Sequence, residues 1–163
     1  WFRNKIKEFG TPKSMDLIRD GKRTSIPTFG LLNMFVYDPK LKDKLPYYDT
    51  FPLVLPIEEY NNGFLGINLH YLSVPMRIRL LDRLTETANN KKFDESTRLN
   101  ADYSKLKNVN LIKPCLKRYL AGQVKSKFRK VGADEFIIAT LLPVQKFKKQ
   151  SDNHVFGKSR GMV

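Results

Sequence analysis

The side chains best suited to bind a ligand are lysines and arginines, and they are concentrated in two stretches. Between Tyr103 and Ala133 there are nine Lys or Arg and no Asp or Glu. Each phosphate that such a cluster neutralises releases counterions, so the pattern favours contact with a nucleic-acid backbone, without sequence readout. A solvated helix face is the competing interpretation, and the missing acids weigh against it. The candidate nucleic-acid-binding residues here are Lys113, Lys117, Arg118, Lys125, Lys127, Arg129 and Lys130.

The second basic stretch lies near the C-terminus, where three lysines surround Phe147. An aromatic ring among cations is typical of grooves that hold a single strand, where the ring stacks on a base. A solubilising tail, or an arm that threads into a neighbouring subunit, explains the same composition equally well. The residues added to the candidate set are Lys146, Lys148 and Lys149.

Groups suited to catalysis or metal binding are scarce. A catalytic histidine needs a nucleophile or a carboxylate within hydrogen-bond reach, and no Ser or Cys motif accompanies His70, which we therefore predict to be structural. His154 and the single Cys115 make a weak metal case. The carboxylates lack the acid-x-Lys pattern of a nuclease, and no phosphate-binding glycine loop is present. We predict a protein that is not an enzyme, with no cofactor, metal or small-molecule substrate. The carboxylates considered are Asp49, Glu58, Glu59, Asp94, Glu95, Asp134 and Glu135.

The overall charge indicates an acidic partner. The 163 residues include 30 Lys or Arg against 16 Asp or Glu, a formal net charge of +14. Such a balance produces self-repulsion that an acidic partner relieves. Nucleic acid is the first candidate, an acidic protein surface the second and anionic lipid the third, although small proteins of large assemblies are often basic too. No apolar run is long enough to cross a bilayer, so we expect no membrane partner.

These basic stretches must be positioned by a core, and residues 46–72 are the best candidate because they contain no Lys or Arg. They predict a hairpin of strands 51–57 and 64–71, since Asn61-Asn62-Gly63 supplies turn residues that tolerate positive φ. Pro52 and Pro56 remove donors from the same side of the first strand. That strand is therefore predicted to lie at the edge of its sheet, with the proline side free, bulged or covered.

The remaining elements complete an α+β domain. Residues 31–37 predict a strand that joins the hairpin in an antiparallel meander. Apolar spacing predicts helices over 76–88 and 115–131, the second with its apolar residues four, four, four and three apart and opened by Pro114. A last strand is expected over 135–142, and a short one is considered near 98–102. The prediction is an antiparallel sheet of four or five strands flanked by two main helices, with closure into a small barrel as an open alternative.

Composition also divides the chain. Residues 1–30 predict an N-terminal arm with short helices, and residues 31–144 the core domain. Residues 145–163 predict a basic C-terminal tail, extended and mobile unless a partner orders it.

Three pieces carry a family resemblance: Leu45-Pro46-Tyr47-Tyr48-Asp49, the hexapeptide Gly63-Phe64-Leu65-Gly66-Ile67-Asn68, and residues 113–129. With them, residues 1–150 resemble a group of small virion proteins of T4-like tailed phages, especially those of marine and cyanobacterial hosts. The resemblance implies a DNA end protector, which binds the termini of the linear genome and shields them from host exonuclease. It implies no catalytic residue.

Together these observations predict a non-enzymatic virion protein, made in the host cytoplasm, that binds genome ends through the basic helix and tail and shields them or completes the head. DNA is the expected partner, with other virion proteins docked through the terminal arms. The alternative is a neck, tail or baseplate component that docks on acidic neighbouring proteins without touching DNA.

Overall fold

The structure is a computed structural model that describes residues 23–80, 112–131 and 144–160. The short helices expected before residue 23, the strands considered over 98–102 and 135–142, and most of the helix expected over 76–88 lie outside these residues. The described start of that helix spans residues 74–80. None of the described helices is long and apolar enough to span a bilayer.

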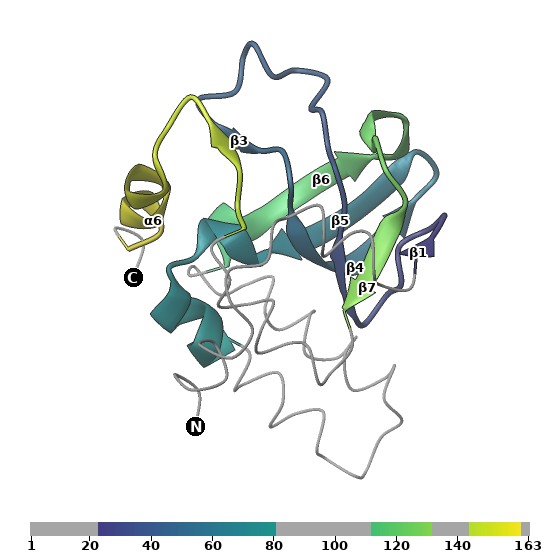
Figure 1. The fold of residues 1–163 in the computed structure, drawn as a ribbon, viewed down its shortest axis with the longest axis horizontal. Helices are drawn as coiled ribbons and strands as arrows, with labels where there is room; N and C mark the ends of the chain where they lie inside the picture. Colours follow the sequence, from purple (N-terminus) through teal and green to yellow (C-terminus); the bar gives the residue numbers. More distant parts are fainter. Residues whose placement is uncertain (1–22, 81–111, 132–143, 161–163) are drawn as a thin grey trace, which may run out of the picture.

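The fold is α+β, as predicted, and its centre is an antiparallel sheet (Figure 1). The sheet has six strands in the order β1-β7-β2-β4-β5-β6, and it remains open rather than closing into a barrel. A second, two-stranded sheet pairs β3 with β8. The strands are β1 (Arg23–Thr24), β2 (Leu32–Met34), β3 (Tyr48–Asp49), β4 (Leu53–Tyr60), β5 (Gly63–Asn68), β6 (Leu116–Leu120), β7 (Phe128–Val131) and β8 (Phe147–Lys148). The sheets are accompanied by the short 3-10 turns η1 (Leu69–Tyr71), η2 (Lys113–Cys115) and η3 (Ala121–Gln123) and by the α-helix α6 (Asp152–Arg160).

The predicted hairpin and meander are confirmed. Tyr60 pairs with Gly63 at the end of β4 and β5, which leaves Asn61-Asn62 as the turn. Gly63 has φ +155°, and a Cβ there would lie 1.9 Å from the carbonyl oxygen of Tyr119. Only glycine lets β6 approach β5 this closely. β2 pairs with β4 on its other side, so the three strands form an antiparallel meander.

The prediction that residues 51–57 form an edge strand is wrong. β4 lies between β2 and β5. Its pairing with β2 involves only Leu53 and Val54, and its register against β5 shifts between Pro56 and Glu58. Pro52 precedes the strand. β2 pairs only with the two β4 residues that lie between Pro52 and Pro56. A central position in the sheet is therefore compatible with the missing N–H groups of the two prolines.

The predicted helix over 115–131 is also wrong. Residues 116–120 form β6, which pairs with β5, and residues 128–131 form β7, which pairs with β1 and β2. A spacing of four returns a side chain to the same face of a strand as well as of a helix, so the apolar pattern does not separate the two. The partner strands, which lie far away in the sequence, decide the outcome.

The core has two clusters. One contains Leu32, Leu53, Leu69 and Val131 and extends to Val155 of α6. The other is aromatic and surrounds Phe35, whose ring centroid lies 4.8 Å from that of Phe128 and 5.3 Å from that of Tyr119.

The expectation of an extended C-terminal tail is wrong. β8 runs beside β3, and α6 (yellow in Figure 1) follows it. Val155 is buried in the core, so this segment gains apolar contacts that a free tail lacks.

Candidate nucleic-acid interface

A hollow of about 330 Å³ runs along β6, opposite the loop formed by residues 39–48. It is lined mainly by cations, tyrosine rings and leucines, together with Pro39 and one carboxylate, Asp49, and we call it the tyrosine groove. Its cations are Lys40, Lys117 and Arg118; its rings are Tyr37, Tyr48, Tyr71 and Tyr119; its leucines are Leu41, Leu45, Leu116 and Leu120. Cations beside aromatic rings are the combination that nucleic-acid grooves use for phosphates and bases.

The two β6 cations lie on opposite faces of the strand, because consecutive side chains alternate. Lys117 is half-buried, with Nζ 4.2 Å from the centroid of the Tyr71 ring. Burial lowers its pKa, and within the described residues no carboxylate forms an ion pair with it. Arg118 is exposed, stacks on Tyr60 at 3.7 Å from the ring centroid and donates to the side-chain oxygen of Asn62. No carboxylate of the described residues neutralises either charge, so both can attract an anion.

The C-terminal segment adds a third predicted cation. Lys148 pairs with Tyr48 across the β3–β8 sheet. Residues directly opposite in an antiparallel pair place their side chains on the same face. The exposed Lys148 therefore lies on the face where Tyr48 enters the groove.

Lys149 has a structural task instead. Its Nζ donates to the carbonyl oxygens of Lys42, Asp43 and Leu45, at 2.6, 3.2 and 2.8 Å. Its backbone has φ 73°, in the left-handed region. The ammonium group thus holds the loop that forms the wall of the groove. With those acceptors, it has less freedom to contact a phosphate.

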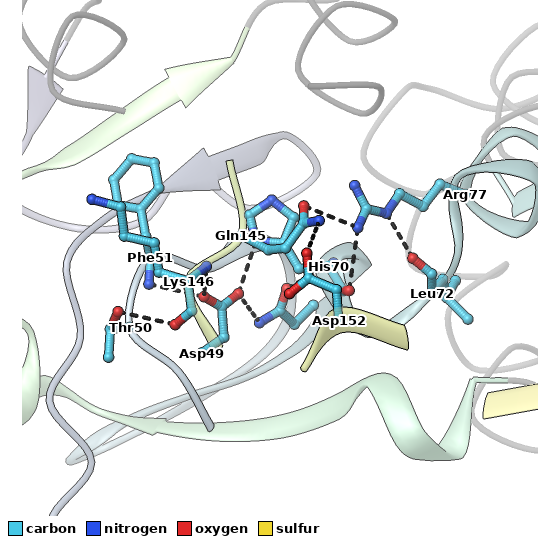
Figure 2. Close-up of polar contacts among 10 residues, drawn as sticks. Asp49, Thr50, Phe51, His70, Leu72, Arg77, Gln145, Lys146 and Asp152 are labelled. Atoms are coloured by element: carbon cyan, nitrogen blue, oxygen red, sulfur yellow. Dashed lines mark hydrogen bonds and ion pairs between the residues drawn. The ribbon is translucent and has the colours of Figure 1, made fainter. Parts of the chain in front are cut away.

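A buried polar network supports the groove from within (Figure 2). Asp49 accepts hydrogen bonds from the backbone N–H groups of Phe51 and Lys146, at 2.9 and 3.2 Å, and from the Asn68 side chain at 3.1 Å. Its second oxygen lies 2.8 Å from Nδ1 of His70. Although burial opposes ionisation, His70 and these donors together lower the pKa of Asp49. Four hydrogen-bond partners thus hold the ionised carboxylate in place where Asp49 borders the groove.

Arg77 extends this network to the C-terminal segment. Its guanidinium donates to the carbonyl oxygen of Leu72 at 2.8 Å and to the side chain of Gln145 at 3.3 Å. Gln145 in turn donates to Asp152, the first residue of α6, at 2.9 Å. Burial lowers the pKa of Arg77 to about 10, an effect that Asp49 and Asp152 oppose. The network joins β3, η1, the 74–80 helix and α6, and it explains why a polar tail docks on the core.

The comparison with known families decides what this surface belongs to. Residues 1–160 match the family described as Phage T4 terminal DNA protecting protein. The chain belongs to this family. Membership confirms the resemblance seen in the sequence and implies protection of DNA ends in a phage by a protein that is not an enzyme. No curated protein and no solved structure matches the chain.

In this member of the DNA-protecting family, the predicted cations do not share one surface. Lys117 and Arg118 line the groove and Lys148 adjoins it, whereas Lys125 and Lys127 are exposed between η3 and β7. Lys113, on η2, and Lys146 are exposed, and Lys130 is half-buried. Arg129 is buried, with 6% of its surface exposed, so it offers little to a phosphate. The single basic helix face, on which the predicted set depended, is replaced by separate strands.

Sequence reasoning missed the rings of the groove and Lys40. The tyrosines lie within or next to apolar runs of the sequence, and such runs indicate core packing. Three of them are largely buried: Tyr37, Tyr71 and Tyr119. Phe147, which we considered as a base-stacking residue, is half-buried with its ring edge-on to Tyr71 at 5.1 Å. A second hollow of about 480 Å³ near β1 is lined by Glu59 and by no Lys or Arg, which makes it a poor phosphate site.

Proposed function

We propose that the chain binds the ends of linear phage DNA at the tyrosine groove and shields them from exonucleases. The observation that carries the proposal is the meeting of Lys40, Lys117 and Arg118 with four tyrosines in one groove, with Lys148 beside it. Family membership supports the class of ligand. The net charge of +14 supports attraction to DNA from a distance.

Protection in this proposal is steric. An exonuclease must place its active site on the terminal nucleotides, and a bound protein of this size covers them. The chain itself needs no catalytic group, because occupancy alone prevents digestion. Binding must therefore be long-lived compared with nuclease attack, which favours contacts beyond phosphate attraction.

The test is a titration of the chain with linear duplex and with closed-circular duplex of the same sequence, at low and high salt. We expect tighter binding to the linear form, weaker binding at high salt, and protection of the linear form from an added exonuclease. The variant Lys117→Gln/Arg118→Gln should lose most of the preference and the protection. Equal binding to both DNAs, or digestion of the bound ends at an unchanged rate, would overturn the proposal.

A charge-matched control separates the groove from general attraction. Arg79→Gln/Lys158→Gln removes the same number of cations from exposed positions on the 74–80 helix and on α6. We expect this control to keep the preference for ends. If it loses the preference as fully as the groove variant does, net charge rather than the groove is responsible.

The proposal also places the protein in the virion, with its terminal segments, residues 1–30 and 145–163, docked on other virion proteins. An exposed apolar surface near β1 supports such docking: 74% of Ile26 and 40% of Phe29 are accessible. This surface also supports the alternative of a neck or tail component. Mass spectrometry of purified particles and of separated heads and tails tests the location. Absence from particles would exclude both placements.

A further inference from the structure

The tyrosine groove is too small for a duplex and suits a single nucleotide. Its volume of about 330 Å³ is at the lower end of the roughly 300–1,000 Å³ of pockets that hold small molecules. A base pair is larger than one base, and its edges are joined to a second backbone. Any DNA base that enters the groove must therefore be unpaired and unstacked.

The sides of the groove match the parts of one nucleotide. Leu41 and Leu45 lie on the 39–48 loop with 59% and 37% of their surfaces exposed, and Tyr48 is half-buried. Flat apolar and aromatic surfaces are what the face of a base prefers. Along β6, Lys117 supplies a cation on one face of the strand and Arg118 a cation on the other, so each can hold a different phosphate. Neither forms an ion pair in the part of the chain described.

The loop wall is held in place before a ligand arrives. The Lys149 ammonium bonds three of its carbonyl oxygens, and Lys42 pairs with Asp38 at 2.9 Å. A wall fixed in advance lowers the ordering cost of binding. The exposed leucines are therefore held at the groove, an arrangement that favours an apolar partner there.

We propose that the groove takes the terminal nucleotide of a DNA strand as an unpaired base, with the base against Tyr48 and Leu41, its phosphate on Lys117 and the neighbouring phosphate of the strand on Arg118. This inference rests on the proposed function and supplies its specificity. Taking a base out of the duplex costs unpairing and unstacking energy, and this cost is lowest where the base is already unpaired. A terminal base has a stacking neighbour on one side only. A groove for an unpaired base therefore selects ends over interior sites without reading sequence.

Three DNA duplexes test the inference, each exposing one end: a blunt end, an end with one unpaired nucleotide, and an end whose last nucleotide keeps its phosphate and sugar but lacks the base. We expect the overhang to bind more tightly than the blunt end, because no pair must open. The abasic end should bind roughly tenfold more weakly, because the stacking is lost. Equal affinity for the abasic and the complete end would overturn the inference.

Variants assign the effect to the groove. Tyr48→Ala should reduce the distinction between complete and abasic ends to less than twofold, while Tyr48→Phe keeps the ring and the distinction. Because Tyr48 belongs to a short strand, Leu41→Asp is a second variant at a mostly exposed position. It should weaken binding of the complete end more than of the abasic end. Discrimination that persists at full strength in both Tyr48→Ala and Leu41→Asp would place the base elsewhere and overturn the inference.

The outcomes separate this inference from the function on which it rests. If the chain prefers and protects ends but does not distinguish an abasic end, the proposed function stands and the nucleotide pocket fails. If the chain binds no DNA at low salt, both fail. In that case the leucines of the groove, together with β6, which is the last strand of the sheet among the described residues, would be a docking site for a protein segment.

Discussion

Nδ1 of His70 lies 2.8 Å from a carboxylate oxygen of Asp49, and both side chains are almost completely buried. Burial lowers the pKa of His70 despite the nearby carboxylate, and the positive charge of Arg77 adds to this effect. The imidazole is therefore neutral and donates its Nδ1 proton to the ionised Asp49. Nε2 has no hydrogen-bond partner among the described residues, which fits an unprotonated nitrogen. Since Asp49 also holds the backbone of Lys146, this pair links the core to the C-terminal segment.

Acid should weaken the fold through His70. Its pKa in the folded state lies below its usual value of 6.5, so the unfolded chain binds more protons as the pH falls through that value. The stability contributed by the neutral form is present above about pH 6.5 and is lost progressively below it. Asp49, whose pKa is also lowered, adds a further loss in stronger acid, below about 3.8. Urea unfolding at pH 7.5, 6.5 and 5.5 measures how the free energy of unfolding depends on pH. His70→Gln should flatten the dependence, and an unchanged slope would show that another group is responsible.

Lys149→Met should loosen the wall of the tyrosine groove. The change removes a cation that bonds three carbonyl oxygens but keeps a side chain of similar length. Because the site is exposed, we expect a modest loss of about 1 kcal/mol in unfolding free energy. Faster amide hydrogen exchange over residues 41–45 is the sharper readout. Lys146→Met is the matched control, because the exposed Lys146 contacts Asp49 through its backbone and not through its side chain. Unchanged exchange in Lys149→Met would contradict the clamp, that is, the proposed hold of the Lys149 ammonium on the loop.

Gly63→Ala should disrupt the approach of β6 to β5. The added methyl group would lie 1.9 Å from the backbone oxygen of Tyr119, and φ at this position is unfavourable for other residues. We expect a loss of about 2 kcal/mol or more in denaturant unfolding, because backbone on both sides must move. Gly122→Ala is the natural comparison, since a Cβ there has nothing within 4 Å. Similar losses in the two variants would show that the close approach is not a constraint.

The salt dependence of DNA binding should show how many groove cations contact phosphates. The logarithm of the DNA affinity falls with the logarithm of the salt concentration by roughly 0.9 for each neutralised phosphate of duplex DNA. Lys117→Gln/Arg118→Gln should therefore reduce that slope by about 2, if each cation contacts one phosphate. Fluorescence anisotropy over a range of salt concentrations gives the slopes. A slope equal to that of the wild type would remove these two residues from the interface even if the affinity fell.

Local sequence signals predicted the meander well and the rest of the sheet poorly. The β4–β5 hairpin follows from alternating apolar residues on either side of Asn61-Asn62, and β2 joins it as expected. β6 and β7 were assigned to a helix because the spacing of Leu116, Leu120, Val124 and Phe128 fits both structures. Pairing with β5 and β2 decides between them. Such long-range pairs have no local signature.

The sequence predicted several cations of the candidate site but not the groove that they line. Lys117, Arg118 and Lys148 were named from composition, yet the same reasoning included Arg129, which is buried, and Lys149, whose ammonium bonds a loop. Charge counting treats every lysine as equally available. The tyrosines of the groove could not be separated from core residues, because a ring at the margin of the core has the same periodicity as one inside it.

Because Lys149 lies near the C-terminus, its bonds to the loop can form only late in synthesis, and the tyrosine groove is completed then. Lys149 and Leu45 are 104 residues apart in the chain, and Asp49 reaches 97 residues forward to the backbone of Lys146. During synthesis the β4–β5 hairpin can form early, whereas the groove stays open on one side until translation has passed residue 149. We expect nascent or prematurely terminated chains to leave DNA ends unoccupied. Completed molecules would then meet no competition from unfinished ones.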